Sequence, residues 1–188
     1  SDTITHDDIP PSGTIAINDS GNAEYTNDSS PDLTLSATDA NGLDKMYITN
    51  TSGCASGGTE EAYATSKSNW SLGQTDATAT VYVKFKDTSG NWSSCISDTI
   101  VHDGTNPAGT LTIDPSGDAN YTNDATPSLT MNGTDTNTLA EMYITNTSGC
   151  ASGGTWEAYA SSKASWSLSS LNAVNNVYVL YKDIAGNT

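Results

Sequence analysis

The sequence repeats itself with a shift of 96 residues and without a gap. The segment MYITNTSGCASGGT begins at Met46 and recurs unchanged from Met142, and SDTITHDD from Ser1 recurs as SDTIVHDG from Ser97. More than half of the positions compared are identical, which indicates a recent duplication within a tandem array. Each repeat of such an array is one structural unit, so the chain must fold into copies of a single small domain.

Within each repeat the apolar residues alternate with period two, the pattern of half-buried β-strands. This pattern predicts strands at residues 14–18, 33–37, 45–49, 70–72, 80–86 and 95–101, each bounded by Gly, Asn, Asp or Pro. About six or seven short strands in one repeat are typical of an immunoglobulin-like sandwich. We therefore expect an all-β chain of two tandem immunoglobulin-like β-sandwich domains, with Trp70, Leu72, Trp166 and Leu168 in the cores.

The phase of the repeat predicts the domain boundaries. Residues 1–8 match the last strand and linker of a repeat, so we assign them to a preceding copy. The first immunoglobulin-like repeat then spans residues 9–103, and the second spans residues 104–188 and lacks its final strand. We expect further copies on both sides in the native protein.

The chain is strongly acidic, with 22 Asp and Glu against 6 Lys and Arg and a formal net charge of -16. A surface of this charge repels nucleic acids and anionic membranes, so we predict no nucleic-acid partner. No apolar run approaches the roughly 18 residues of a membrane span. Charged residues make up only 15% of the chain, and Ser, Thr, Asn and Gly replace them, as in secreted all-β proteins.

A fixed order of short motifs closes the first repeat. The sequence KDTSGNWS from Lys86 is followed by a strand ending in SDTI and by the linker DGTNP from Asp103. This order resembles the tandem bacterial immunoglobulin-like repeats in the stalks of large secreted adhesins and related surface proteins. The resemblance covers both copies, although the cysteines and the DGTNP linker depart from the commonest pattern.

The resemblance implies a protein that is extracellular or on the surface of a bacterium. In that family the repeats act as spacers, calcium often stiffens the junctions between domains, and the adhesive chemistry usually lies in other domains.

The three cysteines follow the repeat. Cys150 is the counterpart of Cys54, and the counterpart of Cys95 would fall about three residues beyond Thr188. Each complete repeat therefore has two cysteines, and in an oxidising compartment we expect a disulfide between Cys54 and Cys95. The alternative is a pair of free buried thiols. A zinc site is not expected, because the sequence has no CxxC pair.

Acidic and amide residues are the only candidates for a binding site. In an immunoglobulin-like topology the loop after the second strand and the loop before the last strand lie at the same end as the entering linker. The candidate ligands there are Asp7, Asp39, Asp87 and Asn91 in the first copy, and Asp103, Asp135, Asp183 and Asn187 in the second. Several oxygen ligands from loops suit Ca²⁺. The alternative is that these side chains only form turns by bonding to their own backbone.

No arrangement of residues predicts catalysis, so we expect no enzyme. His6 and His102 occupy the same linker position in the two copies, and we expect both in solvent. A sandwich of this size has no room for a cleft holding paired carboxylates. The glycines of CASGGT lack the strand-to-helix context of a phosphate-binding loop.

Two functions fit these features. The first is a structural spacer of an extracellular adhesin or filament, whose partners are the neighbouring repeats and, by lateral or end-to-end association, other copies of the chain. The alternative is a glycan- or protein-binding module of a surface protein or secreted enzyme, with exposed Trp92 and Trp156 as contacts. Each Trp is missing from the other copy, where Thr188 and Glu60 replace it, so we favour the spacer.

Overall fold

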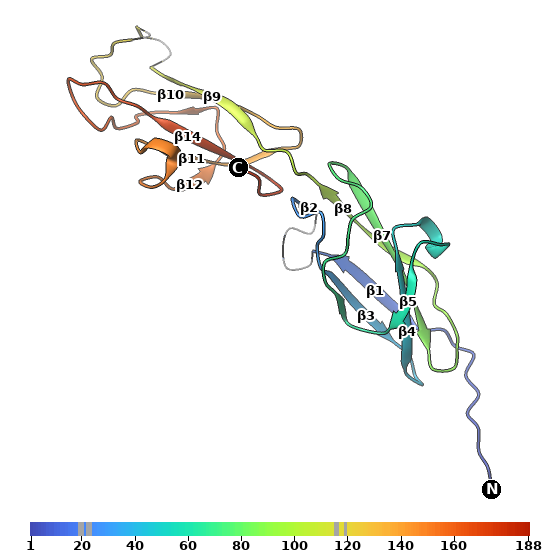
Figure 1. The fold of residues 1–188 in the computed structure, drawn as a ribbon. Coiled ribbons are helices and arrows are strands. Elements are labelled where there is room, and N and C mark those ends of the chain that lie inside the picture. Colours follow the sequence, from blue (N-terminus) through green and yellow to red (C-terminus); the bar gives the residue numbers. More distant parts are fainter. Residues whose placement is uncertain (19–20, 22–23, 115–116, 119) are drawn as a thin grey trace. The chain divides into compact units, whose positions relative to one another are not determined.

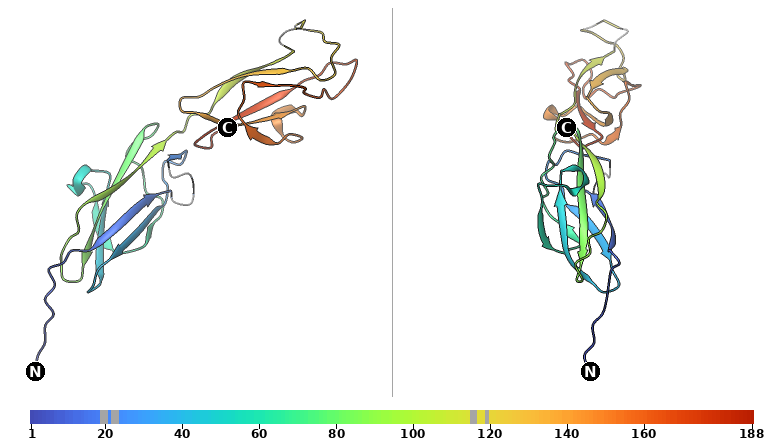
Figure 2. Two further views of the ribbon diagram at one scale, coloured as in Figure 1. Left: turned by 180° about the vertical axis from the view of Figure 1, so that it is seen from behind. Right: turned by 90° about the vertical axis from the view of Figure 1, so that its right-hand side faces the viewer.

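A computed structural model describes residues 1–18, 21, 24–114, 117–118 and 120–188. The chain divides into two compact units, Ser1–Gly104 (unit 1) and Thr105–Thr188 (unit 2). Both units consist of β-strands joined by loops and single 3-10 turns, so the expected all-β fold is confirmed (Figure 1, Figure 2).

Unit 1 is a sandwich of two sheets. The smaller sheet has the order β1-β3-β6, formed by Ser12–Ile17, Leu33–Thr38 and Ser66–Lys67. The larger sheet has the order β2-β8-β7-β4-β5, formed by Tyr25–Thr26, Ile96–His102, Thr78–Asp87, Leu43–Thr49 and Thr59–Ala62. The two-residue β2 runs parallel to β8, and the other strand pairs are antiparallel. This is the arrangement of an immunoglobulin-like sandwich.

Unit 2 repeats this plan with counterparts of β1, β3, β4, β5, β6 and β7, and its described residues form no counterpart of β2 or β8. One sheet has the order β13-β10-β9, from Ser162–Lys163, Leu129–Thr134 and Ala108–Ile113, and the other has the order β12-β11-β14, from Trp156–Ala158, Leu139–Thr145 and Tyr178–Asp183. The register is the same in both units: Met46 faces Phe85 across β4 and β7, and Met142 faces Tyr181 across β11 and β14.

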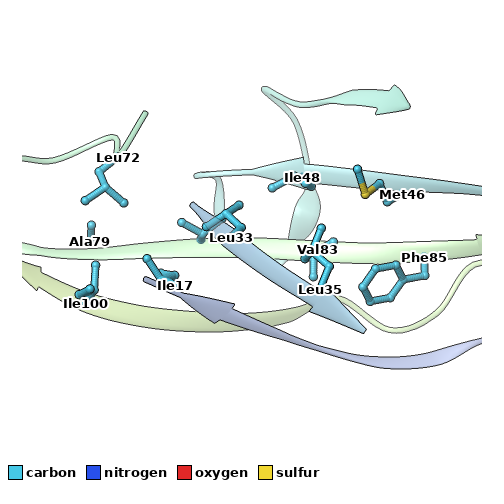
Figure 3. Close-up of a cluster of buried hydrophobic side chains, with 11 residues drawn as sticks. Ile17, Leu33, Leu35, Met46, Ile48, Leu72, Ala79, Val83, Phe85 and Ile100 are labelled. Atoms are coloured by element: carbon cyan, nitrogen blue, oxygen red, sulfur yellow. The ribbon is translucent and has the colours of Figure 1, made fainter. Parts of the chain in front are cut away.

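The cores lie between the sheets, because alternate side chains of each strand point inward. In unit 1 the strands of both sheets contribute, and Figure 3 shows their side chains meeting around Leu33, Val83 and Phe85, each of which has 0% of its surface exposed. In unit 2 Leu129, Met131 and Ile144 occupy the same place. Leu72 is buried, and Trp70 packs against the same core while its Nε1–H donates to Asn50 Oδ1 at 2.8 Å.

The period-two pattern located β1, β3, β4, β7 and β8, and one predicted strand was wrong. Residues 70–72 belong to no strand, although the N–H groups of Trp70 and Leu72 donate to Pro31 and Ser29 carbonyls at 3.0 Å. The strand in this region is β6, at Ser66–Lys67. Residues 1–11 also form no strand, whereas the matching residues of β8 do, because β8 is held by backbone hydrogen bonds to β7 and β2.

Cys54 and Cys95 are joined by a disulfide, with their Cα atoms 5.8 Å apart, as expected from the repeat. Cys54 ends the short turn η1 (Ser52–Cys54) after β4, and Cys95 immediately precedes β8. The bond therefore ties the end of β4 to the start of β8 across the larger sheet. Cys150, at the end of η2 (Ser148–Cys150), is a free thiol, and burial raises its pKa.

Candidate functional site

Three carboxylates of unit 1 converge at one end of the sandwich. Asp7 lies in the entering segment, Asp39 follows β3, and Asp87 is the last residue of β7. A carboxylate oxygen from each lies within 4.8 Å of the others. We refer to these three residues as the acidic triad.

Asp87 is the most rigidly held member. It has 0% of its surface exposed, and its two oxygens accept hydrogen bonds from the backbone N–H and the side-chain amide of Asn91, each at 2.8 Å. Burial acts to raise its pKa. Hydrogen bonds from Asn91, and from the backbone of Gly90 and Ser89, outweigh burial and lower the pKa. The carboxylate is therefore held ionised in a fixed orientation.

Asp7 is attached to the same loop, although it is distant in sequence. Ser89 Oγ donates to Asp7 Oδ2 at 3.2 Å, and Asn91 Nδ2 donates to the backbone carbonyl of Asp7 at 3.1 Å. The Asn91 amide thus contacts both members through its nitrogen. In this geometry Asn91 positions Asp7 and Asp87, whereas its prediction as a calcium ligand requires its oxygen.

The loop that carries Asp39 is connected to the loop after β7. Asp39 Oδ1 accepts the N–H of Asn41 at 2.8 Å, which is the turn geometry that the sequence suggests. Thr88 Oγ1 donates to the Asn41 carbonyl at 3.0 Å, and Thr88 N–H donates to the Gly42 carbonyl at 3.1 Å. Asp39 therefore both forms a turn and brings its carboxylate to the acidic triad.

The acidic triad has the spacing that one calcium ion requires. Ca²⁺ binds oxygen at about 2.3–2.6 Å, so two oxygens on one ion are separated by at most about 5 Å. All three triad oxygens fall within this limit. Carboxylates on three separate loop or terminal positions also suit the irregular coordination of Ca²⁺ better than the strict octahedron of Mg²⁺.

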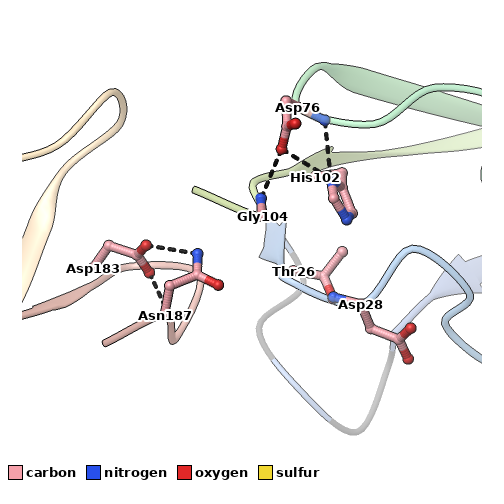
Figure 4. A network of polar contacts seen from close by, with 7 residues as sticks. All are labelled: Thr26, Asp28, Asp76, His102, Gly104, Asp183 and Asn187. Atoms are coloured by element: carbon pink, nitrogen blue, oxygen red, sulfur yellow. Dashed lines mark hydrogen bonds and ion pairs between the residues drawn. The ribbon is translucent and has the colours of Figure 1, made fainter. Parts of the chain in front are cut away.

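The corresponding residues of the second copy are Asp103, Asp135, Asp183 and Asn187, each 96 positions later. Within unit 2, Asn187 donates to both oxygens of Asp183, from its N–H at 2.9 Å and its side-chain amide at 2.7 Å (Figure 4). Asp135 Oδ1 accepts the N–H of Asn137 at 2.8 Å. Asp135 Oδ2 is buried, and no donor among the described residues bonds to it. Asp103 follows β8, and its N–H donates to the Thr26 carbonyl at 2.9 Å.

The two tryptophans of the alternative function lie on sides that face away from the cores, Trp92 beside the larger sheet of unit 1 and Trp156 in the β12-β11-β14 sheet of unit 2. Trp92 bridges to Lys86 beside β7 and is half-buried. Trp156 begins β12 and is 40% exposed, with its ring centre 5.6 Å from that of Tyr143. Both rings contact lysine: Lys84 and Lys86 approach Trp92 at 4.8 and 5.4 Å, and Lys182 approaches Trp156 at 5.4 Å.

His102 corrects the expectation that both histidines lie in solvent. It ends β8 and is only 5% exposed, whereas His6 is exposed. Its Nδ1 accepts the N–H of Asp76 at 2.9 Å, and Asp76 Oδ1 also accepts the N–H of Gly104 at 2.7 Å (Figure 4). His102 is therefore part of a structural polar network, and the alternation of buried residues along β8 is the sequence signal for it.

No protein-family model and no curated protein matches the sequence. Among solved structures, the chain is similar to fibronectin(III)-like modules of CbhA from Clostridium thermocellum, with a TM-score of 0.52 and 9% identity, over 93% of this chain and 88% of that one. The chain has a fibronectin(III)-like sandwich fold. A tetra-tandem repeat from the extending region of a large adhesion protein is matched with a TM-score of 0.31 and 19% identity, over 94% of this chain and 47% of that one.

Among the residues that the structure describes, no helix is long and apolar enough to cross a membrane.

Proposed function

We propose that the chain is a two-repeat structural spacer from the stalk of an extracellular bacterial adhesin or filament, without catalytic activity. The observation that carries this proposal is the repetition of one sandwich, with the same strand register, in two consecutive units. Stacked copies of one domain give length in proportion to their number. The acidic surface keeps such an array soluble, and neighbouring repeats are its principal partners.

Calcium is the cofactor in this proposal. In unit 1 the triad residues Asp7, Asp39 and Asp87 would hold it, and Asn91 would keep two of them in place. Three clustered carboxylates repel one another, and a divalent cation both removes the repulsion and joins the entering segment to the two loops. Because Asp7 lies in the segment that precedes the first sandwich, a bound ion would stiffen the entry to the unit.

Within unit 2 the matching residues Asp135, Asp183 and Asn187 would serve in the same way. The buried Asp135 Oδ2 supports this extension, because a buried carboxylate oxygen without a hydrogen-bond donor is unfavourable unless a cation neutralises it.

Thermal unfolding with added calcium tests the metal site. For a Kd of about 1 mM, typical of weak extracellular sites, 10 mM Ca²⁺ stabilises the native state by about 1.4 kcal/mol. For a domain of this size that is a rise of about 6–11 °C in the melting temperature of unit 1. Asp39→Asn should abolish most of the rise, because an amide oxygen can keep the turn but loses the charge.

Asp28→Asn is the matched control. Asp28 Oδ1 accepts the N–H of Ser30 at 2.8 Å, the same turn geometry as Asp39, and Asp28 lies outside the triad. This variant should keep the full calcium response. An equal response in Asp39→Asn and Asp28→Asn would contradict a calcium site at the triad.

Small-angle scattering of the full chain tests the spacer role separately. Calcium should increase the maximum dimension relative to chelator, and sodium at equal ionic strength should reproduce only part of the change because it screens charge without bridging ligands. The same maximum dimension with calcium and with chelator would refute stiffening by calcium.

A further inference from the structure

The larger sheet of unit 1 presents a basic and aromatic surface. Met46, Val83 and Phe85 point into the core, so the alternate residues of β4 and β7 face outward. We refer to Lys45, Tyr47, Lys84, Lys86 and Trp92 as the outer face. Its strands lie side by side in the sheet (Figure 1). In a chain with 22 acidic residues, half of all 6 basic residues are on this one surface.

Two lysines of the outer face differ from the other four lysines of the chain in their ion pairing. Four of the six lysines contact a carboxylate, at 2.6 to 3.3 Å: Lys45 with Glu60, Lys67 with Glu61, Lys163 with Glu157, and Lys182 with Glu141. Among the residues that the structure describes, Lys84 and Lys86 have no carboxylate within 4.0 Å. Their positive charges are uncompensated, although the chain has an excess of acids.

Aromatic rings hold these two ammonium groups on the surface. The Lys84 ammonium lies 5.0 Å from the centre of the Tyr47 ring and 4.8 Å from that of Trp92, and the Lys86 ammonium lies 5.4 Å from Trp92. Such contacts restrict a flexible side chain without neutralising its charge. The Cα atoms of Lys84 and Lys86, two residues apart on one strand, are about 6.7 Å apart, so β7 carries two neighbouring positive charges on its outward side.

The second copy has the corresponding strands β11, β12 and β14 without this surface. Lys84, Trp92 and Glu60 are replaced by Leu180, Thr188 and Trp156. Lys45 is replaced by Glu141, which pairs with Lys182 at 3.0 Å, so the attractive pair in unit 2 corresponds to two lysines opposite each other in unit 1. Opposed like charges across strands are unfavourable for the fold alone. Lys45 is paired with Glu60, whereas ion pairing among the described residues does not account for the charges of Lys84 and Lys86.

We infer that the outer face of unit 1 binds an anionic polysaccharide, whose carboxylate or sulfate groups pair with Lys84 and Lys86. The charges are complementary, and the surface is an open sheet face that an extended polymer can follow. A protein partner fits less well, because the centres of protein interfaces are depleted of charge, whereas this face carries two ammonium groups without an ion pair to any described residue. Nucleic acid, with one charge per about 1.7 Å, is repelled by the remaining acidic surface more strongly than a polysaccharide whose charges are more widely spaced.

Isothermal titration of the full chain, with chelator present so that calcium cannot bridge carboxylates, tests this inference. The probes are hyaluronan and heparin, with dextran, polyglutamate and single-stranded DNA for comparison. At least one of the two anionic polysaccharides should bind, and binding should weaken as salt is raised. Lys84→Leu, which installs the residue of the second copy, should raise Kd at least tenfold. Lys84→Arg should bind within threefold of the parent.

Lys67→Leu is the charge-matched control, because Lys67 is paired with Glu61 and lies on the other sheet. It should leave Kd within threefold of the parent. Glu141→Lys combined with Leu180→Lys should add a second binding site in unit 2. The inference is overturned if neither polysaccharide binds, if Lys84→Leu binds as tightly as the parent, or if Lys67→Leu weakens binding equally. Comparable binding of dextran, polyglutamate or DNA would overturn the assignment to anionic polysaccharides.

Because chelator removes calcium from this assay, its outcome is independent of the proposed metal site.

Discussion

Removing the disulfide should destabilise unit 1 by an amount that follows from its loop. The bond joins residues separated by 41 positions, and the entropy of closing such a loop in the unfolded chain corresponds to about 3.9 kcal/mol at 25 °C. The double substitution Cys54→Ala and Cys95→Ala removes this restriction and leaves both strand ladders intact. Since small domains are stable by about 5–15 kcal/mol, the loss is a large share of the total.

Hydrogen exchange followed by mass spectrometry measures this loss in each unit separately. Exchange of the most protected amides of β7 and β8 should become roughly 600-fold faster, since each 1.4 kcal/mol is a factor of ten. Amides of β11 and β14 should be unchanged. Cys150→Ala is the control, because Cys150 is a free thiol and its removal should not affect β7. An acceleration below tenfold in β7 and β8 would refute loop entropy as the source of stabilisation.

Three further outcomes can be tested by single substitutions or labelling. Gly13→Ala places a methyl group 2.6 Å from ring carbon Cε2 of Phe85, so it should lower the free energy of unfolding by about 1–3 kcal/mol. An unchanged midpoint of urea unfolding would show that the strands separate freely to make room for the methyl group. Tyr181→Phe removes the hydroxyl that donates to the Thr110 carbonyl at 2.8 Å and should cost about 1 kcal/mol of unfolding free energy by urea titration; no loss would mean that water replaces the bond. Because burial raises the pKa of Cys150, less thiolate is present at any given pH, and its alkylation by iodoacetamide should follow a pH profile displaced upward from that of a free cysteine peptide.

The period-two pattern predicted the long strands because each has one face in a core. β3 and β7 alternate buried and more exposed residues along almost their full length, so the apolar positions report burial directly. β2 and β6 have only two residues each, which is too short for a period to appear. β5 contains no fully buried residue, and its pairing with β4 is set by the backbone. These short strands exist because longer neighbours offer hydrogen bonds, which the local sequence does not encode.

The convergence of Asp7, Asp39 and Asp87 could be anticipated because topology places particular loops at one end of the sandwich. The hydrogen bonds of Asn91 could not, since its amide can present either nitrogen or oxygen to a neighbour. The unpaired state of Lys84 and Lys86 was also beyond prediction from the sequence. It depends on which carboxylates come within reach, and that is decided by the cross-strand register.

The two copies show how an array of this kind can vary its surface and keep its architecture. The register of β4 with β7 is the same as that of β11 with β14, including the irregularity at Leu43 and at Leu139. The exchange of Lys84 for Leu180 occurs on the outward side of this ladder, where the backbone and core do not constrain it. The triad carboxylates lie at the end of the sandwich and border that surface, since Asp87 follows Lys86 and Asn91 precedes Trp92. Under the proposed functions, substitutions on the outer face change the ligand site of one repeat and leave Asp7, Asp39 and Asp87 in place, so a stalk of such repeats would acquire binding in selected copies while every copy kept its role as a spacer.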